Sequence, residues 1–201
     1  MRLPSTPRVE FLRTLADEIL HHYGRGRTVI SVDGSDASGR ARVAEDLAEV
    51  LREDDERNVF SASLHFFQRS TAEQNAFGTP TPERRYRFGY DYSALRRVLV
   101  EPFRINGSAG FVMEHFDPDR DTWIEPTWST TSPDAILIVE GEFANRPELH
   151  DLWLFSILVE SGPETAADRL YRAEVAPRNL VDAVVDNTDA AAPRRLFLDS
   201  C

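Results

Sequence analysis

The sequence predicts an α/β fold in three layers, with helices on both faces of a doubly wound, mostly parallel sheet. Predicted strands and helices alternate along the chain, which is typical of βαβ units. Two apolar runs, 135–139 (AILIV) and 153–159 (WLFSILV), have the continuous hydrophobicity of strands buried on both faces. The order of strand, glycine-bounded loop and helix over 27–53 indicates the opening βαβ unit.

The other elements follow from periodicity and capping residues. Residues 8–23 carry apolar side chains at helical spacing, and Thr6-Pro7 has the composition of a helix start. Asp91 is a suitable cap for a helix over 92–100. Further strands are predicted at 27–32, 58–63, 110–116, 183–185 and 195–198, helices at 40–53 and 164–173, a helical turn at 147–152, and irregular backbone at 68–88 and 123–133.

The composition excludes several classes of function. The 201 residues include 23 basic and 34 acidic side chains, a net charge of -11, which argues against binding to nucleic-acid polymers or anionic membranes. Cys201 is the single cysteine, so neither a disulfide framework nor a cysteine metal site is expected. Every basic residue is arginine, so chemistry that needs a lysine amine is excluded. With neither a signal peptide nor an apolar run long enough for a membrane span, we expect a cytoplasmic protein.

The loop after the first predicted strand carries the main functional motif. Residues 34–41 read GSDASGRA, and both glycines of the pattern G-x-x-x-x-G-K-[ST] are present, at Gly34 and Gly39. Such a loop directs backbone amides, and the start of the following helix, at a phosphate. Arg40 stands at the lysine position and Ala41 at the hydroxyl position that would bind Mg²⁺. The alternative is an ordinary turn between a strand and a helix.

Four segments give the sequence a family resemblance. They are VISVDGSDASGRARVAEDLAEVL (29–51), PERRYRFGYDYSALRRVLVEPF (82–103), ILIVEGEFANRPELHDLW (136–153) and RLYRAEVAPRNLVDAVVDNTDAAAPR (169–194). In this order they resemble the uridine kinase-like branch of the P-loop nucleoside kinases, especially its actinobacterial members. The resemblance implies a single P-loop NTPase domain over 1–201 with an irregular substrate-side insertion at about 64–133. It also implies transfer of the γ-phosphate of ATP, with Mg²⁺, to a nucleoside hydroxyl.

The same resemblance suggests roles for individual residues. It places the nucleotide phosphates on the loop and makes Asn187, in a segment expected near the adenine, a further nucleotide-binding residue. It makes Arg40, His65 and Glu140 the candidate catalytic residues. No side chain is assigned to a protein-held metal site. The loop residues are Gly34, Ser35, Asp36, Ala37, Ser38, Gly39, Arg40 and Ala41, and the candidate substrate-binding residues are Tyr86, Tyr90, Asp91 and Asp117.

The sequence also departs from the family pattern. Ser63, Leu64 and His65 stand where the family has an aspartate base, Phe88-Gly89 replaces an Asp-Ser pair, and the stretch between Glu160 and Tyr171 is too short for an arginine-bearing lid. Ordinary structural roles remain open for three candidates: packing for His65, capping or ion pairing for Glu140, and a turn for Asp117.

Three hypotheses follow from these departures. The first is a degenerate kinase with weak or lost phosphotransfer that retains binding of phosphate or of a nucleotide or nucleoside-like molecule. The second is an active kinase whose site is rebuilt from Arg40, His65 and Glu140. The third is an interaction module without a nucleotide site, for which a homodimer is one form and residues 68–88 and 123–133 are the candidate surfaces.

Overall fold

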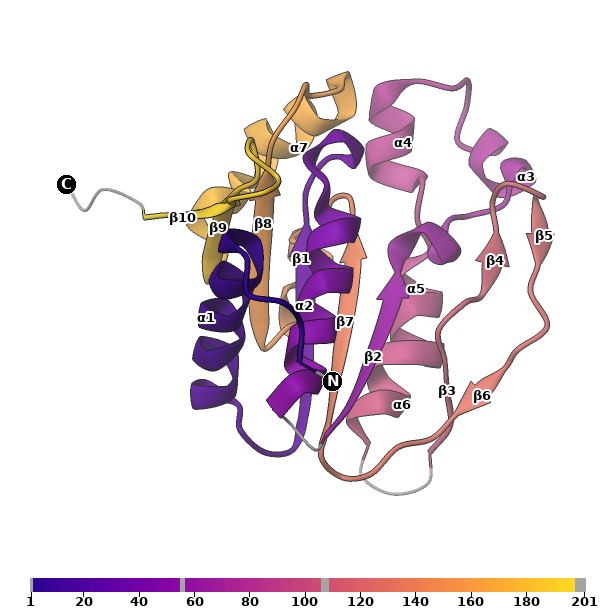
Figure 1. Ribbon diagram of the computed structural model, residues 1–201. Helices are drawn as coiled ribbons and strands as arrows, with labels where there is room; N and C mark the ends of the chain where they lie inside the picture. Colours follow the sequence, from indigo (N-terminus) through magenta and orange to yellow (C-terminus); the bar gives the residue numbers. More distant parts are fainter. Residues whose placement is uncertain (1, 55–56, 106–108, 198–201) are drawn as a thin grey trace.

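A six-stranded sheet forms the middle of the computed structural model, which describes residues 2–54, 57–105 and 109–197 (Figure 1). The strand order is β10-β9-β8-β1-β7-β2, and β10 pairs antiparallel with β9 while the other pairs are parallel. The strands are β1 (Arg27–Asp33), β2 (Asn58–Ser63), β7 (Ala135–Gly141), β8 (Phe155–Glu160), β9 (Ala183–Asp186) and β10 (Arg194–Leu196). The predicted mostly parallel α/β fold is therefore confirmed.

The apolar runs form the centre of this sheet. β1 lies between β7 and β8, with Ile30 opposite Ile138 on one side and Phe155 on the other. Successive side chains point to opposite faces, so Val29 and Ile30 enter two different hydrophobic clusters. Burial on both faces explains why these strands read as continuous apolar runs.

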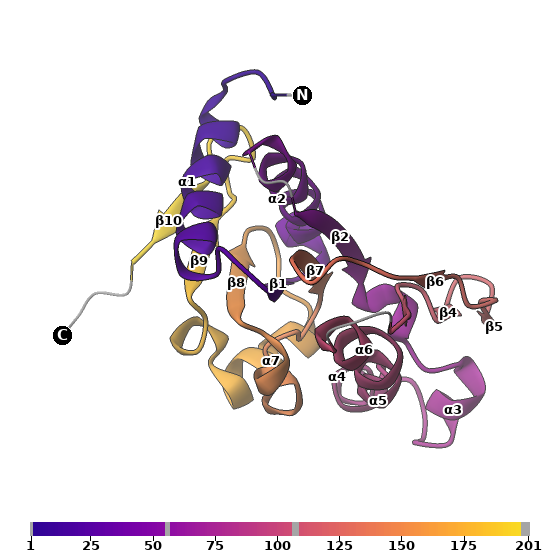
Figure 2. The same cartoon turned by 90° about the horizontal axis from the view of Figure 1, so that it is seen from below.

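Helices cover both faces, as Figure 2 shows from below. α1 (Pro7–His22) and α2 (Arg40–Asp54) pack on one face, where Leu12, Leu47 and Ile136 share a cluster. The Thr6 side chain caps α1 by accepting a hydrogen bond from the backbone N–H of Val9. The other face is covered by α4 (Pro82–Phe88), α5 (Tyr92–Ala94), η3 (Leu95–Val100), α6 (Glu101–Arg104) and α7 (Ala166–Val175).

The segment between β2 and β7 has more regular structure than its sequence predicts. The stretch 68–88 contains α3 (Thr71–Asn75) and α4, whose first turns are capped by Ser70 and Thr81. The helix predicted at 92–100 begins after the Asp91 cap and continues to Arg104. Helices this short are held by caps and by packing, and they lack the periodicity that would reveal them.

The single strand predicted at 110–116 was wrong, because two short strands with different partners occupy this stretch. β3 (Phe111–Val112) pairs with β6 (Trp128–Ser129), and β4 (Phe116–Asp117) pairs with β5 (Thr122–Trp123). The stretch 123–133 is accordingly not wholly irregular. Two-residue strands leave no alternating pattern in the sequence.

The remaining connections are short. They include η1 (Asp36–Ser38), η2 (Leu64–Phe67), η4 (Pro147–Leu152) and η5 (Pro177–Asn179), and η4 is the helical turn expected at 147–152. The edge strand predicted at 195–198 is β10; Leu198, like Cys201, lies outside the described residues. Within the described part of the chain, every helix falls short of the length and apolar content needed to cross a bilayer.

Truncation of a central-strand side chain tests this architecture. Leu137 lies on β7 and is 0% exposed, so Leu137→Ala should lower the free energy of unfolding by about 2–5 kcal/mol through lost burial and the cavity left behind. Leu180→Ala, at a side chain that is 42% exposed, should change it by less than about 0.5 kcal/mol. Urea titration measures both variants, and equal losses would contradict the assignment of Leu137 to the core.

Candidate functional site

The loop between β1 and α2 has a shape that requires both of its glycines. Gly34 has φ +152° and Gly39 has φ +75°. A Cβ atom on Gly34 would lie 2.5 Å from the Ser38 hydroxyl and 2.6 Å from the Val159 carbonyl oxygen, and one on Gly39 would lie 2.7 Å from the Asn187 amide nitrogen. A side chain at either position would therefore be strained and would also collide with its neighbours.

Part of the hydrogen-bonding capacity of the loop is used within the loop itself. The Gly34 N–H donates to Asp33 Oδ1 (2.7 Å), and the Ser38 N–H donates to the Ser35 carbonyl (3.0 Å). The Arg40 N–H donates to the Ser38 hydroxyl (3.2 Å). A bound anion would therefore meet positive charge chiefly at the Arg40 guanidinium and at the start of the 15-residue helix α2.

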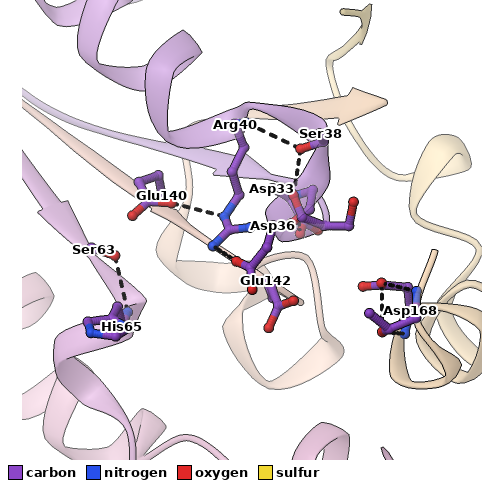
Figure 3. A network of polar contacts seen from close by, with 12 residues as sticks. Asp33, Asp36, Ser38, Arg40, Ser63, His65, Glu140, Glu142 and Asp168 are labelled. Atoms are coloured by element: carbon purple, nitrogen blue, oxygen red, sulfur yellow. Dashed lines mark hydrogen bonds and ion pairs between the residues drawn. The ribbon is translucent and has the colours of Figure 1, made fainter. Parts of the chain in front are cut away.

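The Arg40 side chain folds back across this loop (Figure 3). Its Nε donates to Glu140 Oε2 (2.9 Å), its Nη1 to the Gly34 carbonyl (3.0 Å) and its Nη2 to Asp36 Oδ1 (2.8 Å). The side chain is only 10% exposed. Burial opposes its charge, but Glu140 and Asp36 outweigh that cost and raise the pKa of Arg40 above its ordinary value. Arg40 and Glu140, two of the three candidate catalytic residues, thus lie together.

Asp33 lies beneath the loop in a fully buried network. Its Oδ2 accepts from the Tyr171 hydroxyl, from the Asn145 side-chain amide (2.9 Å) and from the Asn145 N–H (3.2 Å). Burial raises the pKa of Asp33 above its ordinary value, although these hydrogen bonds pull in the opposite direction. The network joins the end of β1 to α7 and to the turn after β7, and so supports the loop from below.

Asn187 forms a direct hydrogen bond with the loop. Its Nδ2 donates to the Ser38 carbonyl (2.8 Å), and its Oδ1 accepts from Arg8 Nη1 (3.2 Å). Arg8 also pairs with Asp46 of α2 at 2.5 Å. The Asn187 side chain therefore joins the loop to α1.

His65 lies apart from Arg40. Its Nδ1 is 3.3 Å from Gln68 Nε2, and its Nε2 is 3.6 Å from Asp119 Oδ2. Figure 3 shows it beside Ser63, whose hydroxyl accepts from the His65 N–H (3.1 Å). These contacts match a structural role for the imidazole.

The four candidate substrate residues occupy different environments. Tyr86 is 2% exposed and packs in the core beneath Arg146, whose guanidinium carbon is 4.5 Å from the ring centroid. Asp91 caps α5 through Ser93 and Ala94, and Asp117 accepts from the N–H groups of Asp119 and Arg120 in a turn. The fourth, Tyr90, lines a cleft beside the loop.

Two residues beside the loop, Glu142 and Arg85, were not among the site residues predicted from the sequence. Glu142 has a 3% exposed side chain and accepts from Arg85 Nη2 (2.5 Å) and from the Tyr90 hydroxyl (3.2 Å). The same Arg85 nitrogen lies 3.6 Å from Asp36 Oδ2. A carboxylate just beyond the end of the central strand was a usable signal for Glu142, because ligands bind at the carboxyl ends of parallel strands. Arg85 gave no comparable signal within its arginine-rich segment.

Pockets lie around the loop. One of about 490 Å³ opens between α4 and α7 and includes Asp36, Arg85, Tyr90 and Glu142 in its lining. A second, of about 290 Å³, lies at the carboxyl ends of β1, β8 and β9 beside Gly34. A third, of about 740 Å³, runs between α2 and β2 past Ala41 and Glu140. Space for small molecules therefore adjoins the loop.

The residues at the loop do not fit a protein-held Mg²⁺. Ala41 has no oxygen on its side chain, and Glu140 Oε2 already accepts from Arg40. Among the described residues, no group of three or more histidine, cysteine, aspartate or glutamate side chains is arranged to hold a metal ion. The guanidinium of Arg40 supplies positive charge beside the loop.

The connection between β8 and α7 carries no arginine. It consists of residues 161–165 (SGPET), and Thr165 closes it by capping α7 together with Asp168. Arg169 donates to the Glu164 carbonyl, and Arg172 pairs with Glu164 at 2.5 Å. Both arginines of α7 thus contact Glu164, which lies within this connection.

The Asp33 network gives a test of pH dependence. Tyr171→Phe removes a donor to the buried carboxylate and should lower the free energy of unfolding by about 1–3 kcal/mol at neutral pH. Because burial raises the pKa of Asp33, the folded protein binds a proton at this carboxyl at a higher pH than the unfolded chain does. The penalty should therefore shrink at mildly acidic pH, and urea titrations of wild type and variant at both pH values measure it. A penalty that grows on acidification would contradict this account.

Comparisons with known proteins find similarity in structure and none in sequence. No family model matches the chain, and no curated protein matches it in sequence. A possible uridine kinase from Bacillus stearothermophilus superposes with a TM-score of 0.75 and 22% identity, over 89% of this chain and 97% of that one. The YGR205w protein gives a TM-score of 0.56 and 14% identity, over 98% and 100% of the two chains. The α/β fold of this protein is thus similar to that of the possible uridine kinase.

Proposed function

We propose that this protein is a degenerate relative of the uridine kinase-like P-loop kinases that binds phosphate or a nucleotide but transfers phosphate weakly or not at all. The observation that carries the proposal is the Arg40 guanidinium, held inside the loop by Glu140, Asp36 and the Gly34 carbonyl. A planar guanidinium presents paired N–H groups to an anion, which suits phosphate binding.

Several features support the loss of catalysis. Phosphoryl transfer depends on positioning and on charge neutralisation, and a single arginine contact can contribute about 10³–10⁵ in rate. This chain has Ala41 at the metal-ligand position, Ser63 at the end of β2 and no arginine between β8 and α7. The effects of such losses are not additive, but together they leave little stabilisation of the transition state for efficient phosphoryl transfer.

The neighbouring pockets give room for the rest of the ligand. The phosphate-bearing end would lie on the loop, and the rest of a nucleotide or nucleoside-like molecule would occupy the space beside Gly34 or beside Asp36. The family resemblance of the sequence implies ATP and Mg²⁺, but the donor set described above gives a divalent ion no side-chain ligand at Ala41.

Ligand-induced stabilisation tests the proposal. A nucleotide at about 100 times its dissociation constant should raise the free energy of unfolding by about 2.7 kcal/mol, without release of ADP above background. Arg40→Ala should abolish this increment. Arg42→Ala is the matched control, because Arg42 is exposed at the same helix start and pairs with Glu45 and Asp46.

The outcomes separate the three hypotheses. ADP release that depends on a nucleoside and on Glu140 would instead establish an active kinase with a rebuilt site. No stabilisation by any nucleotide or polyphosphate, together with a stable dimer in solution, would favour an interaction module. The increment is compared within each variant, because Arg40→Ala also breaks a partly buried ion pair and lowers basal stability.

Restoring the missing groups tests the role of the metal. In the wild type, nucleotide binding should be the same with Mg²⁺ as with a chelator. The double substitution Arg40→Lys and Ala41→Ser restores the amine and the hydroxyl of the loop pattern, and should make binding about tenfold tighter with Mg²⁺ than without it. Calorimetric titration measures both proteins, and strong Mg²⁺ dependence in the wild type would contradict the account of Arg40.

A further inference from the structure

Two arginines converge on the carboxylate of Asp36 from different elements. Arg40, at the start of α2, donates to Asp36 Oδ1 at 2.8 Å. Arg85, on α4, places its Nη2 3.6 Å from Asp36 Oδ2. Asp36 thus lies between the two guanidiniums, and a phosphate group placed between two arginines would make the same kind of contact with more oxygens.

Asp36 is the member of this group that can leave most easily. Its side chain is 69% exposed, whereas that of Arg40 is 10% exposed. Exposed ion pairs contribute little to stability, because water solvates both partners well when they separate. An anion with more charge than one carboxylate can therefore take the place of Asp36 at small cost.

Arg85 is held in position by a buried carboxylate. Its Nη2 donates to Glu142, a buried carboxylate that also accepts from the Tyr90 hydroxyl. The neighbouring Arg84 lines the same cleft but donates to Asn75 Oδ1 at 3.1 Å and to the Gly78 carbonyl. The two adjacent arginines of α4 thus have different partners.

The cleft between α4 and α7 gives a ligand access to this pair. Its lining includes Asp36, Arg85 and Glu142, and its volume is about 490 Å³. The connection 161–165 brings no arginine to the opposite wall, and Arg172 is paired with Glu164. Positive charge on the cleft side of the loop thus comes from α4.

We infer that Arg85 is a second anion-binding residue, and that the terminal phosphate of a nucleotide or another phosphorylated small molecule displaces Asp36 and bridges Arg40 and Arg85. Glu142 and Tyr90 position Arg85 for this contact. The inference rests on the proposed binding of phosphate at the loop and adds to it the class of ligand group, its second cation and the carboxylate that it replaces.

Calorimetric titration with tripolyphosphate, in the presence of a chelator, tests the inference on the full chain. This probe has neither a base nor an acceptor hydroxyl, so it reports on phosphate contacts alone. Arg85→Ala should weaken binding by about tenfold to a hundredfold, the loss of one charge-assisted contact, and Arg85→Lys should recover part of it. Arg87→Ala, the matched control, should bind like the wild type, because Arg87 lies on the same helix but outside the lining of the cleft and pairs with Glu83 and Glu174.

Two further variants probe the displaced carboxylate and the support of Arg85. Asp36→Asn removes the internal competitor and should tighten tripolyphosphate binding by about threefold to tenfold. Glu142→Gln loosens Arg85 and should weaken binding by less than Arg85→Ala does. Urea titration of each unliganded variant verifies that it is folded.

The results distinguish failure of this inference from failure of the proposed function. If Arg40→Ala loses binding while Arg85→Ala binds like Arg87→Ala, the loop binds anions and the role of Arg85 is overturned. Weaker binding by Asp36→Asn would overturn the displacement. If the folded wild type binds neither tripolyphosphate nor a nucleotide, the proposed function fails and this inference fails with it.

Discussion

The ion pair between Arg40 and Glu140 ties the loop after β1 to the end of the central strand β7. Both side chains are mostly buried, so separating them would leave a charge with little water to solvate it. The pair therefore determines where the guanidinium lies, and through the Gly34 carbonyl it also constrains the loop backbone. The shape of the loop and the position of its main positive charge are consequences of the same interaction.

From this pair a chain of alternating charges extends across the site. Glu140, Arg40, Asp36, Arg85 and Glu142 succeed one another and connect the ends of β7, the loop and α4. Three carboxylates and two guanidiniums give this group one excess negative charge, which is why the proposed phosphate ligand would have to take the place of a carboxylate.

Local sequence patterns predicted the strands that are buried on both faces and the helices that begin at a capping side chain. The apolar runs at 135–139 and 153–159 are buried on both faces, and the Thr6 and Asp91 caps lie where their side chains predict. Short helices such as α3 and strands of two residues were missed, since they depend on caps and neighbours more than on periodicity. At the site, the pairing of Arg40 with Glu140 was within reach of the sequence, because Arg40 follows β1 and Glu140 lies at the end of β7, and parallel strands end at one edge of the sheet.

The sequence by itself determined the strand–loop–helix order, the two obligatory glycines and the replacement of lysine by Arg40. Those features are local, since each depends on the residues of one short segment and on backbone geometry. Tertiary structure alone decided that Asn187 bonds to the Ser38 carbonyl and that Arg85 meets Glu142, 57 residues away in sequence. Such contacts depend on how α4 and the loop after β9 pack against the sheet, and a long flexible arginine carries no spacing signal that reveals its partner.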